Sequence, residues 1–146
     1  MQLFFNPELT KTTTSFDFDA LESKHIIKVL RRKIGDELQI TNGKGDFFEA
    51  TIVDDNVKKC SVTISKVSHT ISRKYWLHVA IAPTKTNDRF EWFLEKATEI
   101  GVNEITPIIC TRSERKVVKI ERLKKVVQAA MNQSFQSYLQ IVNDPV

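Results

Sequence analysis

Glycine is scarce in this sequence, with four in 146 residues, and none of the four belongs to a glycine-rich phosphate loop. The chain therefore lacks the usual cradle of backbone N–H groups for nucleotide phosphates. No glycine-rich turn follows the apolar run 75–82, which counts against an α/β enzyme that binds a nucleotide through such a turn. The sequence also shows no nucleophile elbow and no cluster of metal-ligating residues, so no metal is expected.

Cysteine and long apolar runs are equally rare. The only two cysteines, Cys60 and Cys110, each fall inside an expected strand, which favours buried thiols in a reducing compartment over a disulfide. No apolar run approaches the roughly 18 residues of a membrane span. Residues 1–7 lack the charged flank and apolar core of a signal peptide. We therefore expect a cytoplasmic protein with no membrane partner.

The charge of the chain is unevenly placed. Residues 1–70 are neutral overall, and residues 71–146 carry the whole net charge of +4. Residues 24–33 hold five cations and no acid, and residues 112–125 hold seven cations and two acids. Two such basic runs suit a polyanion. Solvated helix faces would give the same counts, so both interpretations stay open.

Residues 1–70 are rich in short β patterns. Asp19 and Glu22 form a capping box that predicts a helix from Ala20 to about Lys28. The Asn-Gly pair in residues 42–45 predicts a hairpin turn between two strands. About five short strands with one helix across them indicate a small β-barrel or sandwich.

After a polar junction at Ser68–Lys74 the pattern changes to longer apolar strands and helices. The apolar runs 75–82 and 105–110 predict strands covered on both faces, and His78 is expected as a core histidine. The capping-box pair Asp88 and Glu91 predicts that a helix between these strands begins at Arg89 and ends at a left-handed Gly101. A second helix, at about 119–135, and a third strand, at 139–142, complete two parallel crossovers.

This order makes residues 75–146 an unfinished α/β sheet with an open edge. Lys85 and Arg112 lie in the loops that follow neighbouring strands, at the edge where open α/β sheets bind ligands. The sequence thus predicts that one ligand meets both cations. The alternative is that they are solvated loop residues.

Three blocks of residues, in order along nearly the whole chain, resemble the RsmE-type ribosomal RNA methyltransferases. The first is His25–Arg31 followed by Gly35-Asp36 and Asn42–Gly45. The second joins Lys85, Arg89 and Glu91 to Lys96–Val102, and the third joins Arg112-Ser113 to Ala129-Ala130 and Gln133-Ser134. Gln136 departs from the family pattern, because many members have an arginine there.

The resemblance implies a PUA-like RNA-binding β-barrel in residues 1–70 and the first part of a SPOUT (trefoil-knot) methyltransferase domain in residues 75–146. Its members use S-adenosylmethionine to methylate N3 of one uridine in small-subunit (16S) ribosomal RNA, and they form homodimers. It also implies that the knot and the S-adenosylmethionine site lie in sequence beyond Val146.

On this interpretation Lys85 and Arg112 face the reacting base and stabilise charge on it. Contacts to RNA phosphates would come from the cations Lys28, Arg31, Arg32, Arg89, Arg115 and Lys119. The alternative is a non-catalytic RNA-binding fragment or module, because the cofactor-binding half is expected elsewhere. A response to S-adenosylmethionine separates the two.

Overall fold

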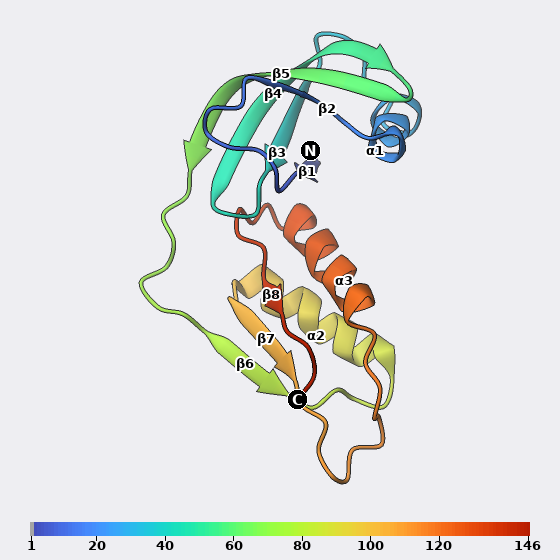
Figure 1. Cartoon of the computed structure of the whole chain (residues 1–146), viewed down its shortest axis with the longest axis vertical. Coiled ribbons are helices and arrows are strands. Elements are labelled where there is room, and N and C mark those ends of the chain that lie inside the picture. Colours follow the sequence, from blue (N-terminus) through green and yellow to red (C-terminus); the bar gives the residue numbers. More distant parts are fainter. Residues whose placement is uncertain (1) are drawn as a thin grey trace. The chain divides into compact units, whose positions relative to one another are not determined.

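The computed structural model describes residues 2–146, and the chain divides into two compact units, Met1–Thr70 and Ile71–Val146 (Figure 1). Each unit has its own cluster of buried apolar side chains. The polar junction expected at Ser68–Lys74 begins later than predicted, because the last strand of the first unit continues to His69.

The first unit is built on one five-stranded sheet. Its strands are β1 (Leu3–Phe5), β2 (Ser15–Asp17), β3 (Glu37–Thr41), β4 (Asp46–Asn56) and β5 (Lys59–His69). The order across the sheet is β1-β3-β4-β5-β2; β1 pairs with β3 in parallel and every other pairing is antiparallel. Register shifts on β4 at Glu49/Ala50 and Ile52/Asp54 mark bulges, which bend a sheet. The strands β1 and β2 are at the two ends of this order. The structure therefore shows a curved mixed sheet, and closure into the expected barrel stays a prediction.

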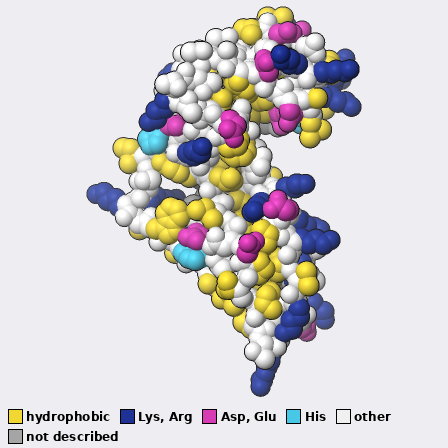
Figure 2. Space-filling model, in the orientation of Figure 1, with side chains coloured by type: hydrophobic (Ala, Val, Ile, Leu, Met, Phe, Trp, Pro, Cys, Tyr) yellow, Lys and Arg dark blue, Asp and Glu magenta, His cyan; other side chains and the backbone are white. Residues whose placement is uncertain are grey.

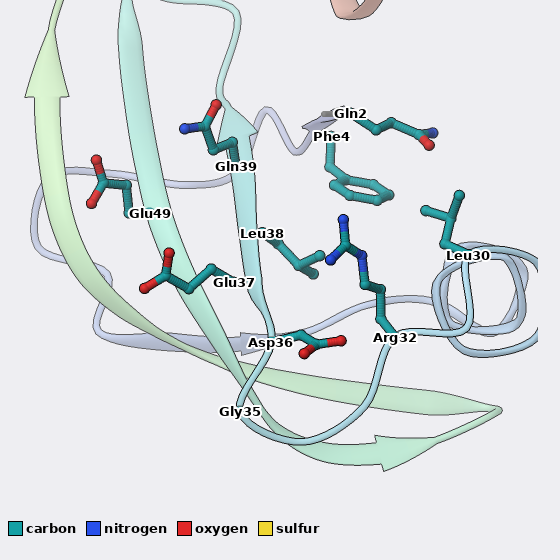
Figure 3. Close-up of a pocket in the computed structure, with 10 residues that line it drawn as sticks. All are labelled: Gln2, Phe4, Leu30, Arg32, Gly35, Asp36, Glu37, Leu38, Gln39 and Glu49. Atoms are coloured by element: carbon teal, nitrogen blue, oxygen red, sulfur yellow. The ribbon is translucent and has the colours of Figure 1, made fainter.

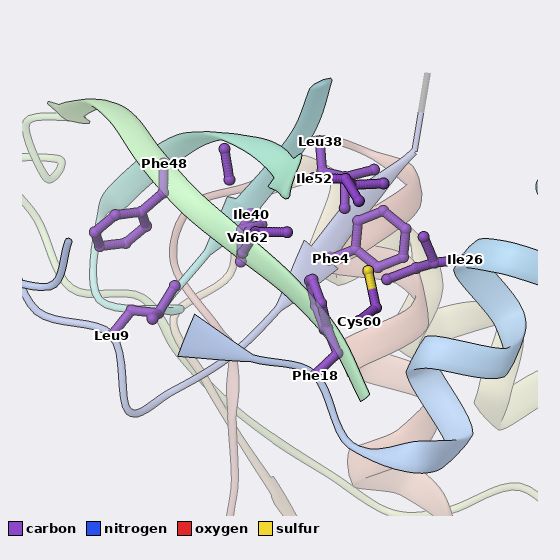
Figure 4. Packing of buried hydrophobic residues seen from close by; sticks show 11 residues of the cluster. Phe4, Leu9, Phe18, Ile26, Leu38, Ile40, Phe48, Ile52, Cys60 and Val62 are labelled. Atoms are coloured by element: carbon purple, nitrogen blue, oxygen red, sulfur yellow. The ribbon is translucent and has the colours of Figure 1, made fainter. Parts of the chain in front are cut away.

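Alternation along the strands decides which side chains fill the core of this unit. On β4 the side chains of Phe48, Ala50 and Ile52 are buried, and on β5 those of Cys60 and Val62 are buried. They pack with Phe4, Leu38 and Ile40 inside the curved sheet (Figure 4). The four-residue hairpin at 42–45, between β3 and β4, forms where the Asn-Gly pair predicts it.

One helical segment crosses the first unit, and it changes character midway. Helix α1 (Ala20–Lys24) begins as predicted, because Asp19 Oδ1 accepts the Glu22 N–H at 2.7 Å. The helical segment continues to Val29, close to the predicted end at about Lys28, but from His25 it is a π-helix, η1 (His25–Val29). The wider turn places Ile26 in the core.

The second unit has a three-stranded parallel sheet. Its strands β6 (His78–Ile81), β7 (Glu104–Pro107) and β8 (Ile141–Val142) lie in that order, which confirms the parallel arrangement. Helix α2 (Asn87–Ile100) connects β6 to β7, and helix α3 (Ile120–Gln133) connects β7 to β8 (Figure 1). The strands are shorter than the apolar runs that predicted them.

Both helices pack on one face of this sheet. Phe90 and Leu94 of α2 and Leu123 and Val127 of α3 form a core with Ile105 of β7 and its strand neighbours. The prediction that both faces of the strands are covered is confirmed on β7, where Ile105 and Thr106 are both buried. It is wrong on β6, where His78 and Ala80 are more exposed than their neighbours Val79 and Ile81.

The ends of α2 show one prediction confirmed and one wrong. Gly101 has φ 90°, and the Val102 N–H donates to the Ala97 carbonyl, which is the hydrogen bond of a Schellman cap. Asp88 does not cap the N-terminus: the cap position is Thr86, which makes no side-chain capping bond, and the helix begins at Asn87 rather than Arg89.

Candidate functional site

The most distinctive local geometry in the chain lies just after η1. Arg31 has φ 55°, a left-handed conformation that costs a non-glycine residue about 1–2 kcal/mol. On either side of it, the Leu30 N–H donates to the His25 carbonyl at 2.9 Å and the Arg32 N–H donates to the Ile26 carbonyl at 3.0 Å. A π-helix followed by a strained arginine is the kind of local departure that proteins keep at functional sites.

This segment carries the first group of cations that the sequence predicts. Lys28, Arg31 and Arg32 are all exposed. Within residues 2–146 none of the three side chains makes a hydrogen bond or an ion pair. Figure 2 shows Lys and Arg side chains gathered around the α1–η1 segment. Exposed, unpaired cations on a fixed backbone suit an anionic ligand, as the sequence predicts.

A cavity of about 440 Å³ opens beside this segment (Figure 3). Phe4 of β1 and Leu38 of β3, both 3% exposed, form part of its lining, and the Arg32 guanidinium points into it. Its polar lining includes Asp36 and Gln2. Sequence reasoning missed this cavity, because no local pattern brings β1, the η1 segment and β3 together.

In the second unit, an ion pair joins the two loops at the carboxyl edge of the sheet. Lys85, in the loop after β6, forms an ion pair with Glu114, in the loop after β7, at 3.5 Å. Both side chains are mostly exposed. Arg112 is exposed in the same loop as Glu114. The two loops therefore lie together, but a carboxylate is the charged partner of Lys85; that one ligand meets Lys85 and Arg112 stays a prediction.

The loop that carries Arg112 is held by a lysine that sequence reasoning did not single out. Lys116 Nζ donates to the carbonyls of Cys110 at 3.0 Å and Thr111 at 2.8 Å. The Cys110 N–H donates to Ser113 Oγ at 3.0 Å, closing the same turn. Among the seven cations of residues 112–125, nothing in the sequence distinguishes Lys116 as the one that fixes the loop.

The remaining predicted RNA contacts are placed as follows. Arg115 is half-buried, and its Nε donates to the Val117 carbonyl at 3.1 Å. Lys119 is exposed at the residue before α3. Arg89 lines a shallow apolar hollow on α2 with Trp92, which is 62% exposed. Gln136, where many family members have an arginine, donates from Nε2 to the Glu99 carbonyl.

A polar network occupies the sheet face opposite the helices. Glu104 accepts hydrogen bonds from Asn143 at 2.7 Å and from the indole of Trp76 at 2.9 Å. These hydrogen bonds, from Asn143 first and Trp76 next, hold the pKa of Glu104 below its ordinary value. His78 Nε2 lies 2.7 Å from Thr106 Oγ1, and the histidine side chain is 44% exposed. The prediction of a core histidine is therefore wrong.

The two cysteines differ in how they compare with the sequence-based prediction. Cys60 is a buried free thiol in β5, as predicted, and its burial raises the pKa of the thiol. Cys110 is exposed and follows β7, so the expectation of a second buried thiol is wrong.

Another carboxylate stabilises the β3–β4 hairpin. Burial alone would raise the pKa of Asp46, but hydrogen bonds from His69 and Asn42 outweigh burial and hold that pKa below its ordinary value. These contacts measure 2.6 Å to His69 Nδ1 and 2.9 Å to Asn42 Nδ2.

Across residues 2–146, no group of three or more His, Cys, Asp or Glu side chains is arranged to hold a metal ion. No helix in that part of the chain is long and apolar enough to cross a bilayer.

Comparison with known proteins first gives the class. The family model described as an RNA methyltransferase domain matches residues 72–146, and that of an RNA methyltransferase PUA domain matches residues 19–65. The chain belongs to this RNA methyltransferase family.

Its curated relatives include proteins named Ribosomal RNA small subunit methyltransferase E. The one from Bacillus subtilis (strain 168) is 30% identical over 99% of this chain, and the one from Buchnera aphidicola (strain APS) is 29% identical over 90% of it. This chain spans 60% and 54% of their respective lengths.

Two solved structures superpose on this chain over its whole length. A probable rRNA-methyltransferase from Porphyromonas gingivalis is 34% identical, with a TM-score of 0.85 over 100% of this chain and 60% of its own. A Ribosomal RNA small subunit methyltransferase E from Neisseria gonorrhoeae, solved bound to S-adenosyl methionine, is 22% identical with a TM-score of 0.86, covering 100% of this chain and 62% of its own. The second comparison shows the shared fold alone.

Proposed function

We propose that this chain supplies the RNA-binding part of an S-adenosylmethionine-dependent methyltransferase that modifies N3 of a uridine in small-subunit (16S) ribosomal RNA. The observation that carries the proposal is the group of exposed cations Lys28, Arg31 and Arg32 on a strained segment, in a chain of the RNA methyltransferase family; within residues 2–146 these side chains make no ion pair. The curated relatives' names support ribosomal RNA as the substrate. Residues 1–70 act as the PUA-like RNA-binding domain and residues 75–146 as the first part of the methyltransferase domain.

The chemistry asks for cations near the base. A uridine N3–H is not acidic at neutral pH, so methyl transfer needs the proton removed or the developing charge on O2 and O4 stabilised. Lys85 and Arg112 at the sheet edge supply such stabilisation. The Lys85–Glu114 pair is exposed, so it is weak enough to exchange for an RNA contact.

The site of the methyl donor is proposed to lie in sequence following Val146, together with the knot and most of a homodimer interface, as the family resemblance implies. The cations of this chain bind and orient RNA, with phosphate contacts from Lys28, Arg31, Arg89, Arg115 and Lys119.

The proposal is tested by separating RNA binding from turnover. Arg31→Ala weakens RNA binding and lowers the slope of log affinity against log salt by about one, because it removes one phosphate contact. In the full-length protein, Arg112→Ala lowers methyl transfer to small ribosomal subunits at saturating RNA. Identical behaviour of the two variants in both assays would refute this division of roles.

The second candidate is a binding module without chemistry, and the short span relative to the curated proteins favours it for these 146 residues alone. A thermal-shift measurement with S-adenosylmethionine separates the two for this chain. No shift is expected from residues 1–146, and a clear shift would place the donor site inside them.

A further inference from the structure

The cavity beside η1 differs in charge from the cationic surface around it. Its lining contains one cation, Arg32, and three acids, Asp36, Glu37 and Glu49. Glu49 is paired with Lys66 at 3.2 Å, so Asp36 and Glu37 remain against Arg32, and a phosphate entering the cavity would still meet more negative than positive charge. The cavity that Arg32 points into is therefore a poor phosphate site, although Arg32 belongs to the basic run that predicts phosphate contacts.

The apolar and polar groups that line the cavity suit a flat ring instead. Phe4 and Leu38 give it an apolar floor, and Leu30 lies at its side. In Figure 3 the planar guanidinium of Arg32 lies beside these apolar groups, and the Asp36 carboxylate lies below it. Unstacked bases in single-stranded RNA bind by stacking on guanidinium or aromatic planes and by hydrogen bonds along their edges.

The Arg32 guanidinium is also available for this role. Within residues 2–146 it makes no hydrogen bond and no ion pair, even though Asp36 belongs to the same cavity. Asp36 Oδ2 accepts the Lys33 N–H at 3.0 Å, which fixes that carboxylate in the turn before β3. The Asp36 carboxylate, which can accept a hydrogen bond, and the Arg32 guanidinium, which has no partner within residues 2–146, thus border the same cavity.

The backbone gives the two neighbouring arginines different surroundings. Arg31 adopts the left-handed conformation and does not line the cavity. The backbone N–H of Arg32 donates to the Ile26 carbonyl, and the Arg32 side chain lines the cavity. Arg31 is left on the open surface, where phosphates are accessible.

We propose that this cavity binds one unstacked nucleobase of single-stranded RNA, stacked on the Arg32 guanidinium, with a base N–H donating to the Asp36 carboxylate. The inference rests on the proposed RNA-binding function and deepens it: Arg32 becomes a base contact, while Arg31 remains a phosphate contact. The cavity selects for a base rather than for backbone charge.

The test uses the 146-residue chain and two fluorescein-labelled probes of ten units, decauridylate and an abasic oligomer with the same number of phosphates. The wild type is expected to bind decauridylate more tightly than the abasic oligomer. Arg32→Lys keeps the charge and removes the planar group, so its affinity for decauridylate falls about tenfold while its affinity for the abasic probe is unchanged. The matched control Arg31→Lys keeps its phosphate contact and binds both probes nearly as the wild type does.

Salt dependence gives a second readout. Arg32→Ala leaves the salt slope for decauridylate unchanged, and Arg31→Ala lowers it by about one. Equal wild-type affinity for the two probes, or an Arg32→Lys variant that matches the wild type on decauridylate, would overturn the base site and leave RNA binding intact. Failure of the wild type to bind either probe would overturn the proposed RNA-binding function as well.

Discussion

Lys85 and Glu114 form a 3.5 Å ion pair across the two loops that leave the carboxyl edge of the parallel sheet. The pair holds an acid at the edge where RNA is proposed to bind. Because both side chains are exposed, the pair contributes little to stability. Its main effect is that Glu114 offsets the positive charge that Lys85 presents to a ligand.

The variant Glu114→Gln tests this effect. Removing the carboxylate frees Lys85, so RNA affinity at low salt is expected to rise about threefold, with stability changed by less than about 0.5 kcal/mol. Binding titrations and urea denaturation measure the two quantities. The control Glu121→Gln removes an exposed acid that pairs with Lys124 on α3. Equal gains from both variants would show that the effect is one of net charge alone.

The left-handed conformation of Arg31 predicts that one substitution there raises stability and weakens RNA binding. Glycine adopts the left-handed region without the steric penalty of a side chain, so Arg31→Gly is expected to raise the free energy of unfolding by about 1 kcal/mol. The same variant loses a phosphate contact and binds RNA more weakly. Urea denaturation and RNA titration provide the measurements.

Arg31→Ala is the matched control, since it removes the same charge and keeps the strain. It is expected to weaken RNA binding as much as Arg31→Gly does, without the gain in stability. A destabilised Arg31→Gly variant would mean that the left-handed conformation is not strained here.

The polar face of the second sheet predicts a dependence of stability on pH. Hydrogen bonds hold the pKa of Glu104 below its ordinary value in the folded state. The stability that these bonds give is present above the unfolded-state pKa and is lost as the pH falls through the folded-state pKa. Thermal unfolding between neutral and acidic pH measures this loss.

In Glu104→Gln the part of the acid-side loss due to this carboxyl group is absent, so the melting temperature falls less steeply with acidification than in the wild type. The control Glu95→Gln changes an acid on α2 outside the network. A Glu104→Gln profile parallel to that of the wild type would contradict a role for this carboxylate.

Periodicity in the sequence is enough to predict the buried face of a regular helix. Leu123, Val127 and Met131 of α3 are buried as their spacing indicates, because an α-helix returns a side chain to the same face every three or four residues. The same rule would place Val29 on one helical face with Leu21, but Val29 lies in the π-helix, whose wider turn does not keep this spacing, and Ile26 is the buried side chain of that segment. No local propensity signals where a π-turn forms.

The site was predictable where it depends on loop position and unpredictable where it depends on tertiary pairing. The order of strands placed Lys85 and Arg112 in loops at one sheet edge, but not the acid Glu114 beside Lys85. An apolar run does not reveal that one face of a short sheet is polar. His78, Glu104 and Asn143 come from three different strand regions and meet only once the sheet has formed.

Lys116 gives the last prediction, because its two carbonyl contacts fix the loop that carries Arg112. In Lys116→Met both hydrogen bonds are lost while the length of the side chain is kept. Since the site is exposed, global stability falls by no more than about 1 kcal/mol, but the amides of residues 111–113 exchange with solvent faster. Hydrogen exchange resolved by residue measures this. The control Lys125→Met removes an exposed cation on α3 and should leave exchange in the loop unchanged. If both variants leave it unchanged, the loop is held by the Cys110–Ser113 turn and the contacts of Lys116 are incidental.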